Sequence, residues 1–281
     1  MRPPPELVAV LGASGASALL VVACAGLGLL VGSFLNVVVW RVPRGASVVS
    51  PPSACPACGA RVRPRDNVPV LSWLLLRGRC RDCAAPISPR YPLVEAGTGL
   101  LFGLTAWWAG WSWVLPALLF AVGLAVALAL IDVDVHRLPD ALVLPSYPVL
   151  AALLLLASAN PGGASDWSAL GRALLGGAAL ALAYAVIWVV YPAGMGLGDV
   201  KLAGLLGMLL GWFGWGAVVV GFFAAFLLAG AVVVALLAAR RVGRRTAVAF
   251  GPWMLVGAAL GVVAGQQALD GYVALFQAVG A

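Results

Sequence analysis

The sequence predicts an all-α polytopic membrane protein with about eight transmembrane helices and a small cysteine-rich, zinc-ribbon-like cytoplasmic loop domain. Of its 281 residues, 63% are hydrophobic and only 10% are charged, a composition that soluble globular domains do not have. Apolar runs near the roughly 20 residues that a membrane helix needs recur along the chain. One long polar segment, residues 40–91, interrupts them and holds four of the five cysteines.

The apolar runs predict the spans in order. The first run is longer than the core of a signal peptide and is followed by no small-residue cleavage site, so we expect it to be retained as a span. The sixth run is short, and its boundary with the seventh falls within residues 211–216. No internal repeat is evident. The predicted spans are 17–39, 92–109, 113–131, 141–158, 168–190, 200–214, 217–238 and 249–267.

The basic residues predict the orientation. With eight spans, one side of the membrane receives the loops 40–91, 132–140, 191–199 and 239–248. This side holds fourteen of the arginines with Lys201 at its edge, whereas the other side holds only Arg2 and Arg172. The positive-inside rule then places both termini outside and the long loop in the cytoplasm. The net charge of +7 therefore reflects topology and predicts no nucleic-acid partner.

The cysteines predict a structural metal site. Cys55, Cys58, Cys80 and Cys83 form two Cys-x-x-Cys pairs whose spacing is close to that of a zinc ribbon, and four thiolates suit tetrahedral Zn²⁺. A loop of about 50 polar residues cannot bury much of a core and needs such a staple. The alternative is two disulfides, which a reducing compartment disfavours. Cys24 lies alone in the first apolar run and is expected to be a small buried core residue.

Asp132 and Asp199 are the predicted catalytic pair. Asp132 ends the third span, where the helix dipole disfavours a negative charge, so something other than stability must keep a carboxylate there. Asp199 follows a glycine-rich turn and could alternatively cap the sixth span. Two carboxyls brought together cannot both ionise easily, so one can activate water while the other donates a proton. The pair thus predicts hydrolysis without a covalent intermediate.

Five other polar residues have weaker claims. Asp134 points about 200° away from Asp132 around the helix, and Asp140 is expected to be the N-cap of the fourth span. Glu95 lies a turn into the second span, where a loop arginine is a possible partner. His136 is expected to be a solvated loop residue without a role. Lys201 is expected only to neutralise the charge of the Asp199 site.

Besides the paired cysteines, six motifs occur in order along the chain. They are residues 32–43 (GSFLNVVVWRVP), 67–73 (NVPVLSW), 87–95 (ISPRYPLVE), 131–140 (IDVDVHRLPD), 194–201 (GMGLGDVK) and 250–252 (FGP). In this order they resemble the motifs of the bacterial type IV prepilin peptidases, a GxGD-type family of intramembrane aspartyl proteases. The resemblance extends from about Gly32 to Pro252.

The resemblance implies a bifunctional enzyme of the bacterial inner membrane. The family cleaves the basic leader of type IV prepilins and pseudopilins after a glycine on the cytoplasmic side, and many members methylate the new N-terminus with S-adenosylmethionine. By motif match the catalytic residues are Asp132 and Asp199. The cysteine-bearing loop is typical of the bifunctional form. The implied parts are an N-terminal segment with the first helix (1–40), the zinc-binding loop (41–91) and the peptidase bundle (92–281).

Two other functions compete with this one. A transporter could use Asp132 and Asp199 as a proton relay, but both acids lie near one membrane face, and paired broken helices are not evident. A zinc-stapled scaffold without chemistry would have no need of the two aspartates. Substrate pilins, the membrane lipid and S-adenosylmethionine are the expected partners, whereas the oligomeric state and the residues that bind the methyl donor stay open.

Overall fold

The computed structural model describes residues 15–192, 194–240 and 249–279. Segment 1–14 and the predicted cytoplasmic arginines 241, 244 and 245 lie outside these ranges. The described chain is helical, with only two isolated β-bridges. It divides into two compact units, Met1–Ala127 and Leu128–Ala281. The domain boundaries expected at residues 40 and 91 stay a prediction.

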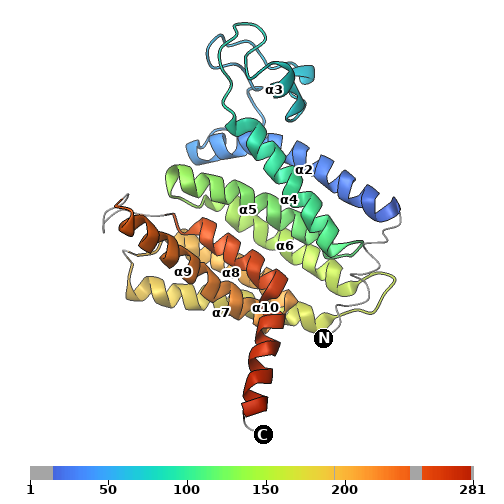
Figure 1. The fold of residues 1–281 in the computed structure, drawn as a ribbon, viewed down its shortest axis with the longest axis vertical. Helices are drawn as coiled ribbons and strands as arrows, with labels where there is room; N and C mark the ends of the chain where they lie inside the picture. The colour runs from blue at the N-terminus through green and yellow to red at the C-terminus, as the bar shows by residue number, and fades with distance from the viewer. Residues whose placement is uncertain (1–14, 193, 241–248, 280–281) are drawn as a thin grey trace. The chain divides into compact units, whose positions relative to one another are not determined.

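The first unit contains two long helices joined by the cysteine-bearing segment. Helix α2 (Gly15–Arg41) packs along α4 (Arg90–Ala109), and α5 (Leu115–Val135) begins in this unit (Figure 1). Between α2 and α4 the chain forms η1 (Val42–Arg44), η2 (Pro64–Asp66) and the short helix α3 (Leu71–Leu75). Cys24 is 8% exposed and packs with Leu20, Ala106 and Leu115, so its predicted burial is confirmed.

The second unit is a bundle that starts with the last two turns of α5. Within it α8 packs along α7, and α10 along α9. Helix α8 also contacts α6, α9 and α10, so it lies at the centre of this unit. The remaining helices are α6 (Asp140–Ala159), α7 (Trp167–Val190), α8 (Leu197–Phe213), α9 (Trp215–Ala238) and α10 (Gly251–Val279).

The α7–α8 pair shows how the bundle is held together. Gly176 and Gly207 face each other so closely that a Cβ on Gly176 would lie 2.6 Å from the Gly207 carbonyl oxygen. Only glycine permits this backbone contact, which is typical of membrane helix pairs. Close packing against α7 therefore fixes the helix that begins beside Asp199.

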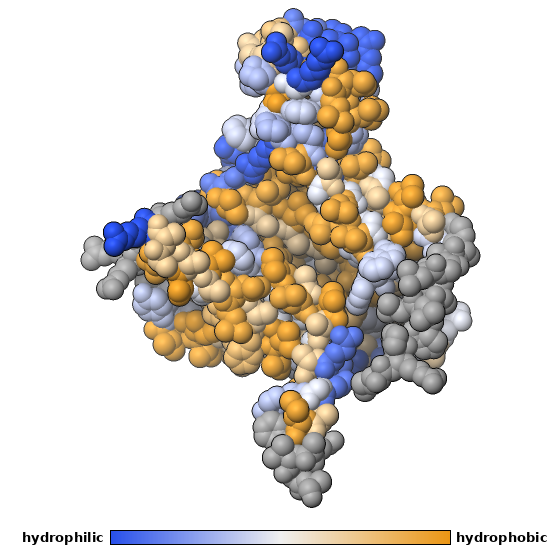
Figure 2. Space-filling model, in the orientation of Figure 1, coloured by the Kyte–Doolittle hydropathy of each residue, from blue (hydrophilic) through white to orange (hydrophobic). Residues whose placement is uncertain are grey.

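Six of the helices in the described residues are long and apolar enough to cross a membrane, namely α2, α5, α6, α7, α9 and α10. The chain is thus a multi-pass membrane protein, and hydrophobic residues cover much of the helical surface (Figure 2). The predicted count of about eight spans is not confirmed. Helix α8 has 17 residues, or about 26 Å, which is shorter than the roughly 30 Å hydrocarbon core. Helix α4 carries Arg90 and Glu95 at its start.

Candidate functional site

Asp132 lies in the last turns of α5 and is 6% exposed. Its Oδ2 accepts a hydrogen bond of 2.9 Å from the backbone N–H of Gly251, the first residue of α10. A Cβ on Gly251 would lie 2.8 Å from the same oxygen, so only glycine fits there without displacing the carboxylate. Asp134 is exposed, as expected from the helical rotation between the two residues. Asp132 is therefore the inward-facing carboxylate of the pair.

Asp199 is the third residue of α8, and Gly196 is the N-cap. Its Oδ2 accepts a 3.0 Å hydrogen bond from the backbone N–H of Gly196. This contact is one half of a capping box, so Asp199 stabilises the helix start from inside the helix. The alternative prediction that Asp199 caps this helix is therefore partly right: Asp199 takes part in the cap, but the N-cap residue is Gly196.

The two carboxyl groups are electrostatic neighbours in the second unit. Asp132 lies close enough for its charge to act on the Asp199 carboxyl. Leu138, in the turn between α5 and α6, lies next to the backbone of Gly198 and next to that of Gly251. A Cβ on Gly198 would meet Leu138 Cβ at 3.0 Å, and one on Gly251 would meet its Cδ2 at 3.5 Å. The Leu138 side chain therefore lies between the start of α8, which carries Asp199, and Gly251, which binds the Asp132 carboxyl.

An aromatic cluster lies beside Asp199. The buried Tyr184 of α7 interacts electrostatically with the Asp199 carboxyl. Its ring packs on Phe222 at 5.5 Å, on Phe226 at 5.6 Å and on Phe250 at 6.3 Å between centroids. Rings in such contact exclude water from their side of the site. Tyr184 was not singled out by the sequence, since a lone tyrosine in an apolar run gives no signal.

Lys201 and Asp140 form an ion pair that links α8 to α6. The Lys201 ammonium lies 2.8 Å from both Asp140 oxygens, and Tyr147 of α6 donates a 2.6 Å hydrogen bond to the Lys201 carbonyl. The expectation that Asp140 is an N-cap is wrong, because Pro139 is the N-cap and Asp140 lies in the first turn. Lys201 pairs with Asp140 instead of with Asp199. His136 is exposed, as expected.

Glu95 has a partner different from the expected arginine. Its Oε2 accepts a 2.7 Å hydrogen bond from the backbone N–H of Val70, and the side chain is buried. Val70 precedes α3 and has a φ of 60°, a conformation that β-branched residues rarely adopt. The carboxylate of α4 therefore fixes the start of α3 within the first unit.

The four loop cysteines are brought together in the first unit. The Sγ atoms of Cys55, Cys58, Cys80 and Cys83 lie within 4.8 Å of one another, and none of the four is in a disulfide. The Cys55 and Cys83 sulfurs are 3.8 Å apart. Two thiolates at about 2.3 Å from a tetrahedral metal ion are also about 3.8 Å apart. The cluster therefore has the donor set and spacing to hold a metal ion.

The two cysteine pairs are built alike. The N–H of Cys55 binds the carbonyl of Ala60, and the N–H of Cys80 binds that of Ala85 in the same way. The bridges Ala54–Arg61 and Arg79–Pro86 close the two turns. Both turns contain one residue with positive φ, Gly59 at 72° and Ala84 at 58°. The loop is thus a local repeat with an offset of 25 residues (80 − 55), which the sequence search for repeats missed.

The thiols do not ionise equally without a cation. Backbone N–H groups of Cys58 and Ala57 lower the pKa of Cys55 to about 7. A backbone N–H of Ala85 acts in the same direction on Cys83, but the neighbouring thiols, Cys58 first, outweigh it and raise the pKa of Cys83 to about 12. Four thiolates at this spacing repel one another unless a positive ion neutralises them.

The arrangement offers two distinct chemistries. The second unit holds two carboxyls whose charges interact, each oriented by one backbone N–H, which suits proton exchange with a water molecule. The first unit holds four sulfur ligands, which leave no open position on a tetrahedral ion. Sequence reasoning identified both sets but missed Gly251, Leu138 and Tyr184. Gly251 and Leu138 had a signal, because they lie in the motifs at 250–252 and 131–140, whereas Tyr184 had none.

Two family profiles match the chain. The profile of the Bacterial Peptidase A24 N-terminal domain matches residues 27–109, which include the four cysteines. The profile of the Type IV leader peptidase family matches residues 118–238, which include both aspartates. No solved structure matches the chain.

Several curated proteins with the name prepilin leader peptidase/N-methyltransferase are similar over most of their length. The protein of Pseudomonas aeruginosa is 36% identical, across 88% of this chain and 91% of its own. The protein of Neisseria gonorrhoeae is 37% identical, with 82% and 85% covered. The protein of Pseudomonas putida is 38% identical, with 86% and 89% covered.

Proposed function

Because the chain belongs to the type IV leader peptidase family, we propose that it cleaves the basic leader of type IV prepilins or pseudopilins after a glycine. The observation that carries this proposal is the neighbouring pair Asp132 and Asp199. Each carboxyl is fixed by a backbone N–H at the start of a helix, Gly251 for one and Gly196 for the other. Such fixed geometry is what acid–base catalysis requires.

The proposed hydrolysis uses one proton shared by the pair. The ionised carboxylate takes a proton from water, and the hydroxyl adds to the carbonyl carbon of the scissile bond while the protonated carboxyl donates to its oxygen. The tetrahedral diol then collapses: the C–N bond breaks, and the amine leaves with the proton of the protonated aspartate. The other aspartate takes a proton from one diol hydroxyl, whose oxygen becomes the carbonyl of the new carboxyl group, so the pair again holds one proton. Helix N-termini at both carboxyls favour the negative charge that the pair carries throughout.

The aromatic cluster supports a water-poor site for this step. Tyr184, Phe222 and Phe250 line the bundle beside Asp199, so solvent reaches the pair from fewer directions. A lower local dielectric strengthens the interaction between the two carboxyls and helps to keep one of them protonated. The apolar helix of a pilin fits such surroundings.

We propose that the cysteine cluster binds one structural Zn²⁺. Four sulfur donors within 4.8 Å suit zinc, and the two equivalent turns present them in pairs. The bound ion would neutralise the thiolates and hold together a segment that has little core of its own. Because four sulfur ligands leave no open position for substrate, the proposed ion is structural.

A second proposed activity is methylation of the new N-terminal amine. The relatives' shared name includes N-methyltransferase, which implies S-adenosylmethionine as the methyl donor. The donor would supply an electrophilic methyl group to the free amine of the cleaved pilin. Among the described residues no glycine-rich turn after a strand offers a cradle for it, so no residue is assigned to its binding.

The proposed orientation places the cysteine loop and both aspartates on the cytoplasmic side of the inner membrane. The arginine distribution supports it, since the loop from Arg41 to Tyr91 alone holds nine of them. A prepilin anchored by its apolar helix would present its basic leader on the same side.

One assay tests the proposed function directly. The purified full chain, in detergent, is mixed with a purified prepilin with and without S-adenosylmethionine, and the products are analysed by mass spectrometry. We expect loss of the leader under both conditions and a mass increase of one methyl group only when the donor is present. An intact prepilin in both reactions would contradict the proposal.

A further inference from the structure

The short helix α3 presents its apolar face outward. Leu71, Leu74 and Leu75 are 52%, 58% and 73% exposed, whereas Ser72 is 6% exposed. The spacing i, i+3, i+4 places the three leucines on one face of the helix. A soluble loop would bury the leucines and expose the serine, so α3 is oriented the opposite way.

Hydrogen bonds fix this orientation. The Ser72 hydroxyl donates to the Arg65 carbonyl at 3.0 Å and accepts from the Val68 N–H at 3.0 Å. The indole N–H of Trp73 donates to the Ile87 carbonyl at 3.0 Å. Turning the leucines inward would break all three bonds, so the outward face is part of the folded loop.

The contact between Val70 and Glu95 places α3 near the end of a long helix. Glu95 is five residues after the start of α4, or about 8 Å along its axis. Helix α3 has five residues and is about 8 Å long. Because Val70 at its start contacts Glu95, the leucines of α3 lie within about 10 Å of the position of Glu95 along the α4 axis. The headgroup layer of a bilayer is about 5–8 Å thick on each side. Leu93 near the start of α4 and Trp40 near the end of α2 are also exposed and apolar.

The charge around α3 identifies its partner. Between Arg41 and Tyr91 there are nine arginines and two aspartates, a net charge of +7 (9 − 2). Both aspartates are already paired, Asp66 with Arg81 at 2.6 Å and Asp82 with Arg63 at 2.7 Å. Figure 2 shows hydrophilic and hydrophobic surface side by side on this loop. A basic surface with adjacent exposed leucines matches an anionic lipid interface, where leucines enter the acyl boundary and arginines contact headgroups.

We propose that the leucine face of α3 docks into the anionic surface of the bilayer that the chain spans. Docking would fix the cysteine loop at the membrane surface at a third point, besides its two connections to α2 and α4. This inference concerns the loop alone and holds whether or not the proposed peptidase activity is found.

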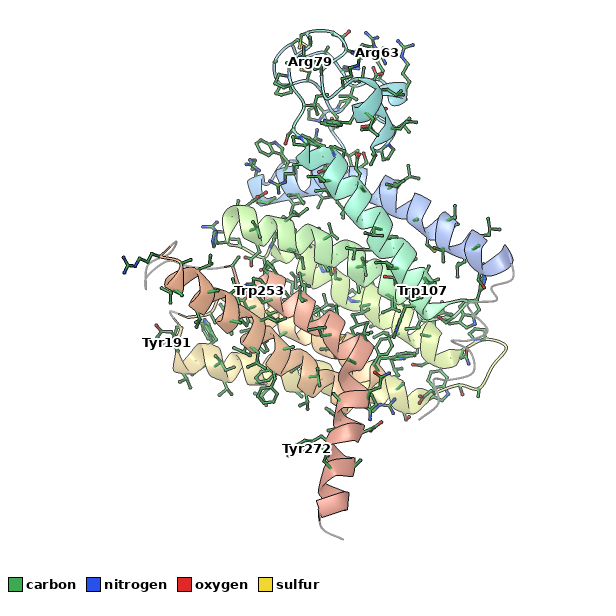
Figure 3. The ribbon with its side chains drawn as sticks, viewed as in Figure 1. Arg63, Arg79, Trp107, Tyr191, Trp253 and Tyr272 are labelled. Atoms are coloured by element: carbon green, nitrogen blue, oxygen red, sulfur yellow. The ribbon has the colours of Figure 1, made fainter. Side chains whose placement is uncertain are left out.

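Photo-crosslinking of the full chain in lipid nanodiscs tests the proposal. The photoreactive residue p-benzoylphenylalanine replaces Leu75 in one variant and Val62 in the control. Val62 is 39% exposed and lies next to Arg63, which Figure 3 shows at the end of the loop away from α2 and α4. After irradiation, peptide–phospholipid adducts are counted by mass spectrometry. We expect several-fold more adducts from position 75, and more with phosphatidylglycerol than with phosphatidylcholine alone.

Equal adduct yields at the two positions, or adducts from position 75 only to protein, would overturn the proposal. The second result would assign the leucine face to another copy of the chain or to a peptide. Each variant is also analysed for metal content, because a retained metal ion shows that the loop is still folded. A second measurement, deuterium exchange of the α3 amides, should slow on adding phosphatidylglycerol and recover at high salt. Exchange that is unchanged by either would also overturn it.

Discussion

The cysteine loop of the first unit and the aspartate bundle of the second unit hold their polar groups in different ways. In the loop, ion pairs such as Asp66–Arg81 and Asp82–Arg63 and the sulfur cluster connect segments that have little core. In the bundle, close packing such as that of Gly176 on Gly207 positions the helices, and Asp132 and Asp199 each accept a hydrogen bond from a backbone N–H. The loop depends on specific bonds, whereas the bundle depends on shape.

The same type of contact serves both regions with different results. Glu95 and Asp132 are both buried carboxylates that accept a backbone N–H from a distant segment. For Glu95 the bond fixes a loop start in the first unit. For Asp132 it fixes a carboxyl that has a second acid as its neighbour. A buried acid is therefore a structural anchor or a catalytic candidate depending on what lies beside it.

The first prediction separates the two regions by the rate of prepilin cleavage. Asp132→Asn and Asp199→Asn should each lower the rate of prepilin cleavage by at least about a hundredfold, because an amide can act neither as a general base nor as a general acid near neutral pH. Both variants should keep the metal content of the parent chain. Asp134→Asn is the matched control, since Asp134 is on the same helix but exposed. Near-normal cleavage by either of the first two variants would contradict the assignment of the pair.

The second prediction separates the regions by metal dependence. The full chain should contain about one zinc ion, and the double variant Cys55→Ser with Cys58→Ser should lose it, because structural zinc contributes about 10 kcal/mol or more to folding of such sites. Deuterium exchange should accelerate in residues 53–87 and stay unchanged in α6 to α10. Cys24→Ser is the control, because Cys24 is buried in the helical part of the first unit. Zinc that persists in the double variant would show that the cysteines are not its ligands.

The third prediction concerns the anchor between α4 and the loop. Glu95→Ala removes the acceptor of the Val70 N–H and should destabilise the start of α3 by about 1–3 kcal/mol. Glu95→Gln keeps a carbonyl acceptor and should have a smaller effect. The measurement is deuterium exchange of the amides from Val70 to Leu74. If these amides exchange at the same rate in both variants and in the parent chain, the contact with Glu95 does not hold α3 in place.

The fourth prediction concerns the stability that the N-cap of α7 contributes to the second unit. Asp166 is the N-cap and accepts a 2.9 Å hydrogen bond from the Ala169 N–H, so Asp166→Ala should cost about 1 kcal/mol of stability. The hydrogen bonds from Ser168 and from the Ala169 N–H lower the pKa of Asp166. A lowered pKa gives stability that is fully present above the ordinary carboxyl pKa and is lost as pH falls through the folded value.

Thermal unfolding in detergent at neutral and acidic pH tests this effect. The difference in melting temperature between the parent chain and Asp166→Ala should shrink as the pH falls below about 4. Asp166→Asn is the control, because asparagine caps as well as aspartate but does not titrate. A difference that is independent of pH would show that the ionised carboxylate does not contribute.

The amino-acid pattern was sufficient to predict the class and the cysteine cluster, and to single out Asp132 and Asp199 as candidate catalytic residues. Composition and apolar run length are properties of the chain itself, so a multi-pass helical protein followed directly from them. Cys-x-x-Cys pairs bring sulfurs together through local turns such as those after Cys55 and Cys80. The motifs around Asp132 and Asp199 were distinctive enough to indicate the family before any geometry was known.

The partners of these residues became visible only when the helices were placed in space. The Val70 N–H on Glu95, the Gly251 N–H on Asp132 and the Asp140–Lys201 pair join positions 25, 119 and 61 residues apart. Such contacts depend on how helices pack, which local patterns do not specify. The same holds for the outward leucines of α3. The hydrogen bonds of the buried Ser72 set the orientation of the helix, whereas a pattern of hydrophobic residues would have turned the leucines inward.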